Sequence, residues 1–206
     1  MQQAMKWLLL LINLLLLTVG PLSELLEEQM VLHLLFQLPV LVLFGWFAGE
    51  ILPKHWQTYL NRYNWQGITG VVVITVVGLF WMLPSALDAA LDSNVYAFAK
   101  VTSMLLLGCT WSLTHRCIHP LVKGVFLLEL WAMLGRFGYL FKVSPDRLCN
   151  NYLLGEQQLV GHILLTLSIV IGALWVAKIL FGNNTTQEKT DIPSSPEVKG
   201  YLHVCK

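Results

Sequence analysis

The chain has 206 residues, of which 56% are hydrophobic and only 12% are charged, about half the charged fraction of a soluble domain. Its 13 Lys and Arg residues nearly balance its 12 Asp and Glu residues. This balance excludes a nucleic-acid binder that works by bulk positive charge, and also an acidic disordered chain. The four cysteines form no CxxC motif, so a disulfide framework or a zinc finger is excluded as well.

About 20 apolar residues in helical conformation cross a hydrocarbon core that is about 30 Å thick. In chain order, the apolar runs predict six transmembrane helices, at residues 5–22, 30–52, 67–90, 95–117, 120–141 and 157–181. The runs are continuous rather than alternating, which excludes a β-barrel. The sequence therefore predicts an all-α, polytopic membrane helical bundle in one domain, residues 1–181.

The two ends of the chain carry separate signals. Lys6 precedes a Leu-rich run as in a signal peptide, but no A-x-A site follows and Pro21 occupies the expected cleavage position. Residues 5–22 are therefore predicted to be a retained anchor. Residues 182–206 are polar and rich in Pro and Ser, which predicts a flexible, disordered tail. Most basic residues fall on the side of the membrane that holds both termini, which predicts cytoplasmic termini.

His33 is the most informative polar residue inside a predicted span, where an ionisable group costs about 2.5–3.5 kcal/mol. Met30 lies three residues earlier and Gln29 four residues earlier, so all three are expected on one helical face. Neutral imidazole and a thioether sulfur form a ligand set that suits Cu(I). The structural alternative is a histidine that hydrogen-bonds to a neighbouring helix.

Asp88 and Asp92 are spaced i, i+4 at the outer end of the third predicted helix. Lys100 follows across a short hairpin, where it is expected to neutralise one carboxylate. Pro84 is expected to kink the third helix and to free the carbonyl four residues before it. A kink beside Met82 would form a pocket wall, although such kinks and interfacial carboxylates are also common as structural features.

The start of the sixth predicted helix carries Glu156, which the helix dipole favours, and His162, which is expected at a depth similar to that of His33. Two histidines on different helices could bind a metal or clamp a haem iron, or could serve as proton-relay or packing residues. Cys149, just before this helix, could be a redox-active thiol. The sequence contains no nucleophile elbow, P-loop, HExxH or dinucleotide-binding glycine motif, so no enzymatic activity is expected.

Three stretches in order resemble the CtaG-type cytochrome c oxidase assembly factors. Residues 29–45, QMVLHLLFQLPVLVLFG, resemble their helix with two histidines four residues apart. Residues 80–113, which begin FWMLPSALDAALDSN, resemble their Trp-His-x-Pro segment and the helix after it. Residues 154–164, LGEQQLVGHIL, resemble their Asp-Gln-x-x-x-Gly helix start. The chain departs from the pattern where the family has histidines, at Gln29, at Met82 and near Lys100.

The resemblance implies a non-enzymatic membrane assembly factor for a haem-copper oxidase in a bacterial inner (cytoplasmic) membrane, with copper delivered on the outer face. Copper is the one cofactor it suggests, and the residues left to hold it are Met30, His33, Met82 and His162. Asp88 and Glu156 would orient a histidine N–H, with Asp92 and Lys100 as further polar residues. The expected partners are membrane lipid and an oxidase subunit or another assembly factor, and no nucleic acid.

Three alternatives remain open. The first is a haem-b electron carrier with His33 and His162 as axial ligands. The second is a small transporter whose pathway is lined by Asp88, Lys100 and Arg136, although the chain shows no inverted repeat. The third is a purely structural subunit of a larger membrane complex, in which none of these polar residues would be essential.

Overall fold

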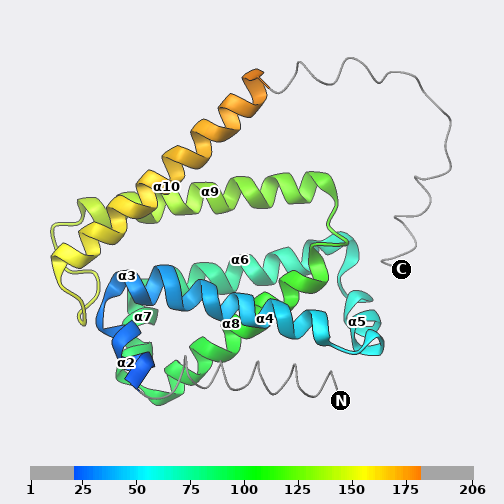
Figure 1. Cartoon of the computed structure of the whole chain (residues 1–206), viewed down its shortest axis with the longest axis horizontal. Coiled ribbons are helices and arrows are strands. Elements are labelled where there is room, and N and C mark those ends of the chain that lie inside the picture. Colours follow the sequence, from blue (N-terminus) through cyan, green and yellow to red (C-terminus); the bar gives the residue numbers. More distant parts are fainter. Residues whose placement is uncertain (1–20, 182–206) are drawn as a thin grey trace.

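The computed structural model describes residues 21–181, which are helices joined by loops, without a strand in that range (Figure 1). In chain order, the elements are α2 (Pro21–Glu28), α3 (Met30–Leu32), the π-helix η1 (His33–Gln37), α4 (Leu38–Ile51), α5 (Lys54–Asn61), the 3₁₀ turn η2 (Trp65–Gly67), α6 (Ile68–Met82), α7 (Pro84–Asp92), α8 (Asn94–Thr114), α9 (Pro120–Val143) and α10 (Leu154–Phe181). The predicted anchor lies almost wholly outside the described residues, and the predicted tail lies outside them entirely.

Four helical stretches of the described chain are long and apolar enough to cross a membrane, and they are Met30–Ile51, Trp65–Met82, Pro120–Val143 and Leu154–Phe181. The all-α fold is therefore confirmed for the described residues, and these four stretches are compatible with a membrane protein, whereas six spans are not confirmed. The fourth predicted span corresponds to α8, which has 21 residues but carries Lys100 and several hydroxyl side chains. Since α8 packs against α4, α6 and α7, protein rather than lipid surrounds much of it.

The third predicted span is divided at Leu83 into α6 and α7. Leu83 is extended (φ −71°, ψ 129°) and Pro84 is the first residue of α7, because proline disfavours helical conformation in the residue before it and is well suited to the first position of a helix. The carbonyl of Phe80 accepts a hydrogen bond from the Leu83 N–H at 3.1 Å. The expectation of a free carbonyl at this position was therefore wrong.

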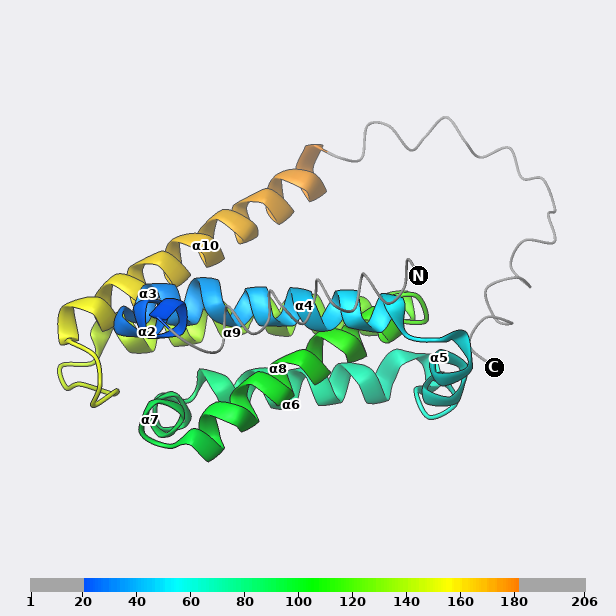
Figure 2. The ribbon, with the colours of Figure 1, turned by 60° about the horizontal axis from the view of Figure 1, so that its bottom comes forward.

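Glycines allow α4 and α8 to cross in close contact (Figures 1 and 2). A Cβ atom on Gly108 would collide with the carbonyl oxygen of Val42, and one on Gly49 would lie 2.7 Å from the Cβ of Ser112. Close backbone approach of this kind is how membrane helices associate, because lipid provides no hydrophobic force between them. The α4–α8 crossing is therefore the centre of the bundle.

Helices α9 and α10 form a hairpin that is tightest next to the connecting loop, residues 144–153. A Cβ atom on Gly161 would lie 2.5 Å from the backbone nitrogen of Lys142, and one on Gly138 would lie 2.7 Å from that of Leu165. Farther along, α10 diverges from the bundle in both views (Figures 1 and 2), and its apolar side chains from Leu174 onward are mostly exposed. This part of α10 is free to face lipid.

The two ends of the bundle carry different irregular elements. Helices α2 and α7 and residues 144–153 gather at one end, termed here the loop end, whereas α5 and residues 115–119 lie at the other, termed the α5 end (Figures 1 and 2). Most of the polar residues singled out from the sequence fall at the loop end.

Candidate functional site

His33 lies at the loop end, at the first position of η1, with only 1% of its surface exposed. Neither of its ring nitrogens has a hydrogen-bond partner in the described part of the chain. Met30, one turn earlier, is 0% exposed. A buried polar group without a partner is uncommon in native proteins, and π-helical turns occur frequently at functional sites. The imidazole is therefore the clearest candidate ligand in the described structure.

Gln29 does not share the buried face of Met30 and His33, contrary to the sequence-based expectation. Its backbone is extended (φ −113°, ψ 126°) and separates α2 from α3, so its side chain leaves the helical pattern and is exposed. The buried pair that remains is one imidazole and one thioether.

Tyr152 covers His33. Their ring centroids are 6.3 Å apart at an interplanar angle of 67°, and the Tyr152 hydroxyl donates a hydrogen bond to the backbone oxygen of Glu27 at 3.0 Å. Burial, helped by the nearby Glu27 carboxylate, raises the pKa of Tyr152, which keeps the hydroxyl protonated as a donor. Residue 152 belongs to the loop between α9 and α10, so this loop forms a lid over the histidine.

Lys100 is paired with Glu27 rather than with the carboxylates of α7. Its ammonium nitrogen lies 2.8 Å from Glu27 Oε1, and the side-chain amide of Gln37 donates to the same oxygen at 3.2 Å. The expectation that Lys100 neutralises Asp88 or Asp92 was therefore wrong. The Lys100 side chain reaches α2, where it meets Glu27, instead of turning to the carboxylates of α7.

Asp88 is buried but satisfied by backbone donors. It accepts hydrogen bonds from the N–H groups of Asn150 at 2.7 Å and Asn151 at 3.4 Å, while the more exposed Asp92 accepts from the Asn151 side chain at 3.2 Å. These contacts attach the loop to α7. Because both ring nitrogens of His33 are unpartnered, neither Asp88 nor Glu156 donates to or accepts from that ring in this structure.

The start of α10 also holds the loop in place. The buried side chain of Gln157 accepts from the Leu148 N–H at 2.8 Å and donates to the Phe141 carbonyl at 3.3 Å, while Glu156 is half-buried in the first turn.

Cys149 is buried as well, and burial together with the Asp88 carboxylate raises its pKa to about 12. A thiol that stays protonated is a poor nucleophile, which argues against the redox role considered for Cys149.

Of the four predicted metal ligands, the structure brings Met30 and His33 together. Met82 is half-buried against the hydrophobic core at the end of α6, and His162 is exposed on α10. Within residues 21–181, no group of three or more His, Cys, Asp and Glu side chains is arranged to hold a metal ion. A site at His33 would therefore depend on sulfur and imidazole ligands rather than on carboxylates.

Sequence reasoning missed the groups that surround His33, namely Glu27, Gln37 and Tyr152. Glu27 lies 73 residues from Lys100 and 125 residues from Tyr152, so no local spacing could reveal these contacts. Two weak signals in the sequence pointed to these contacts. Glu27 is an acidic residue just before a predicted span, and Lys100 is a lysine inside another.

No family model, curated protein or solved structure matches the chain. The structure itself shows a helical chain with four stretches long and apolar enough to cross a membrane, and a buried histidine and methionine beside a hydrogen-bonded loop at one end of the bundle.

Proposed function

We propose that this chain is a non-enzymatic membrane assembly factor that holds Cu(I) at His33 and Met30 and passes it to a haem-copper oxidase. The observation that carries the proposal is the fully buried imidazole with two unpartnered nitrogens beside a fully buried thioether. Soft thioether and imidazole ligands favour Cu(I) over divalent ions. Only two neutral ligands are offered, which suits an ion that is passed on rather than retained.

The lid over His33 supports a transfer role. Tyr152 packs against the ring. The loop that carries it is held by Asp88, which accepts from two backbone N–H groups, and by Gln157, which accepts from one. We expect that movement of this loop would withdraw the Tyr152 ring from His33. The oxidase as recipient is supported by the resemblance of residues 29–45, 80–113 and 154–164 to the CtaG-type factors.

A charged pair on α9 supports a protein client. Arg136 and Glu129 form a salt bridge with side chains 64% and 40% exposed, although both lie inside the apolar stretch Pro120–Val143. A charged group inside a membrane span is costly when it faces lipid. Such groups therefore usually face protein or water. A partner helix along this face would remove both from lipid.

Copper content tests the proposal directly. The full chain is expressed with added copper, purified in detergent and analysed by mass spectrometry for metal, with His33→Ala and Met30→Leu in parallel. His55→Ala, which removes an exposed histidine of α5, is the matched control. We expect near-stoichiometric copper in the parent and control, and background copper in His33→Ala. A copper-free parent, or equal copper in His33→Ala, would overturn the proposal.

The client is tested separately with Glu129→Gln/Arg136→Gln. These changes should abolish co-purification with the oxidase subunit while copper binding persists, since the side-chain contacts of Arg136 are with Glu129 and the Ala132 carbonyl and not with His33 or Met30. The haem-b alternative needs His33 and His162 on opposite sides of one haem, but His162 is exposed whereas His33 is buried. The absence of a Soret band in the purified chain would exclude this alternative.

A further inference from the structure

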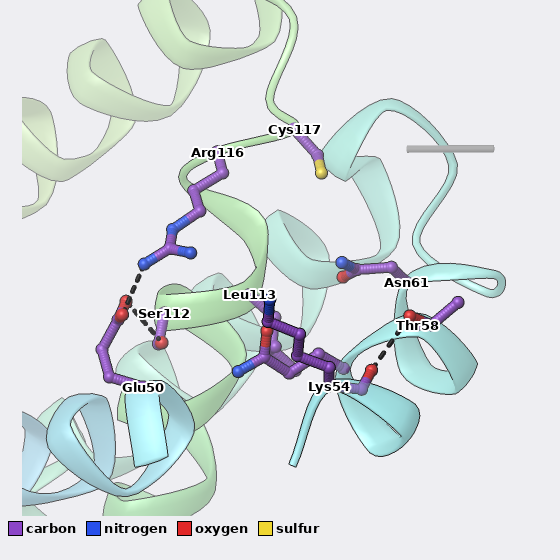
Figure 3. Close-up of a pocket in the computed structure, with 9 residues that line it drawn as sticks. Glu50, Lys54, Thr58, Asn61, Ser112, Leu113, Arg116 and Cys117 are labelled. Atoms are coloured by element: carbon purple, nitrogen blue, oxygen red, sulfur yellow. Dashed lines mark hydrogen bonds and ion pairs between the residues drawn. The ribbon is translucent and has the colours of Figure 1, made fainter. Parts of the chain in front are cut away.

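A polar pocket lies at the α5 end, opposite the copper site proposed above. It has a volume of about 220 Å³ and is formed by the end of α4, by α5 and by the end of α8 (Figure 3). The polar side chains that matter to the argument are those of Glu50, Lys54, Asn61, Ser112 and Arg116. None of them contributes to the surroundings of His33.

The pocket has an excess of positive charge. Arg116 forms a salt bridge with Glu50, and the Ser112 hydroxyl donates to the same carboxylate at 3.2 Å (Figure 3). Lys54 forms no salt bridge within the described chain. Among the lining residues that the structure describes, two cations and one carboxylate leave one positive charge uncompensated. The guanidinium group also has five N–H donors, of which Glu50 uses only a part.

The pocket also contains an unused acceptor. The side-chain oxygen of Asn61 is buried and has no hydrogen-bond partner among residues 21–181. Leaving a buried acceptor unpaired is unfavourable, so a rotation of the Asn61 side chain that turns this oxygen toward a hydroxyl donor of a bound ligand would be stabilised. The pocket therefore suits a molecule with one negative charge and at least one hydroxyl group.

The surroundings place this pocket at the level of lipid headgroups. It lies where α4 ends at Ile51 and just before α6 begins at Ile68, both of which belong to membrane-spanning stretches. The neighbouring exposed aromatic side chains are those of Trp56, Tyr59, Tyr63 and Trp65. Trp and Tyr gather at the membrane–water interface, and basic pockets between membrane helices bind anionic headgroups.

We propose that this pocket binds the headgroup of an anionic phospholipid of the phosphatidylglycerol type. The phosphodiester oxygens accept from the Lys54 ammonium and from N–H groups of Arg116, and a glycerol hydroxyl donates to Asn61. The single negative charge of the phosphodiester balances the excess charge of the pocket. Phosphatidylethanolamine has no net charge, and phosphatidylcholine has neither net charge nor a headgroup donor, so both bind less tightly.

The test is native mass spectrometry of the full detergent-purified chain in an equal mixture of phosphatidylglycerol, phosphatidylethanolamine and phosphatidylcholine. We expect selective retention of phosphatidylglycerol, weakened about tenfold in Lys54→Gln and in Asn61→Leu, as for the loss of one hydrogen bond in each case. Lys123→Gln removes an exposed cation of α9 outside the pocket and should retain the lipid fully. Circular dichroism confirms that each variant is folded.

Two results would overturn the proposal. One is equal retention of the three lipids, or equal loss in Lys54→Gln and Lys123→Gln, which would indicate a non-specific annulus. The other is displacement of phosphatidylglycerol by millimolar inorganic phosphate or glycerol 3-phosphate, which would assign the pocket to soluble phosphate compounds. Persistence of the lipid against both soluble anions supports the headgroup as the ligand.

Discussion

The ammonium nitrogen of Lys100 lies 2.8 Å from Glu27 Oε1, although 73 residues separate the two in the sequence. Lys100 is 1% exposed and Glu27 is 27% exposed, so the pair extends from the interior of the bundle toward its edge. The contact joins α8 to α2, and Gln37 of η1 donates to the same carboxylate oxygen. One carboxylate thus connects three elements around His33.

Removal of Lys100 should be strongly destabilising. Lys100→Met leaves the Glu27 carboxylate without its cation, and breaking a buried pair costs about 3 kcal/mol or more. Thermal unfolding in detergent, followed by circular dichroism, measures the loss. Lys142→Met, at an exposed lysine, should have little effect, and Lys100→Met/Glu27→Leu should recover part of the stability. Equal unfolding temperatures for the Lys100 and Lys142 variants would show that the ion pair is not structural.

Asp88→Asn should loosen the loop over His33. The substitution weakens the acceptor that holds the N–H groups of Asn150 and Asn151, at a cost of about 2 kcal/mol for charge-assisted hydrogen bonds. Limited proteolysis should then cut within residues 144–153 more rapidly. Asp92→Asn is the control because Asp92 is exposed and accepts from a side chain only. The role assigned to Asp88 fails if both variants are cut at the parent rate.

Gly108→Ala should disrupt the crossing of α4 and α8. The added methyl group would collide with the Val42 carbonyl oxygen, and overpacking of this kind costs about 1–3 kcal/mol. Gly124→Ala is the matched change, because a Cβ there meets nothing within 4 Å. It should stabilise α9 by up to about 1 kcal/mol through helix propensity. Unfolding experiments that rank the two variants in the opposite order would contradict this packing.

The thiol of Cys149 should be slow to react in the folded chain. Its pKa is raised from 9.0 to about 12, so little thiolate exists at pH 8. Since the folded pKa exceeds the unfolded one, the stability that this group contributes is complete below pH 9 and is lost as the pH rises toward 12. Maleimide labelling followed by mass spectrometry measures the reactivity, with the denatured chain as reference. Equally rapid labelling of both states would contradict the buried, protonated thiol.

The length of the apolar runs predicted most of the helices. A membrane span must hydrogen-bond all of its own backbone groups, which a helix of about 20 apolar residues does. The spans predicted at 30–52 and 120–141 correspond to Met30–Ile51 and Pro120–Val143. The break at Leu83 was expected only as a kink. Proline restricts the residue before it in either case, and the packing of α7 on α8 is a tertiary property that the local sequence does not encode.

The site was less predictable because membrane helices are apolar on all sides. In a soluble helix, hydrophobic periodicity identifies the buried face, but His33 and His162 both lie in uniformly apolar runs. The sequence therefore provided no reason to distinguish them, whereas His33 is buried and His162 is exposed. The partners of Lys100 and Asp88 depend on contacts across 73 and 62 residues, which lie beyond any local pattern.

The spans of this chain differ greatly in length, and that difference acts on the surrounding bilayer. Trp65–Met82 has 18 residues and Leu154–Phe181 has 28, which correspond to about 27 Å and about 42 Å of helix. A hydrocarbon layer of about 30 Å is slightly thicker than the α6 stretch and thinner than the α10 stretch. Tilting is how a long span fits such a layer, and α10 lies oblique to the other helices in Figure 2. This is hydrophobic mismatch within one molecule. If both stretches cross one bilayer, a thicker hydrocarbon layer would increase the mismatch on the α6 side and reduce it on the α10 side.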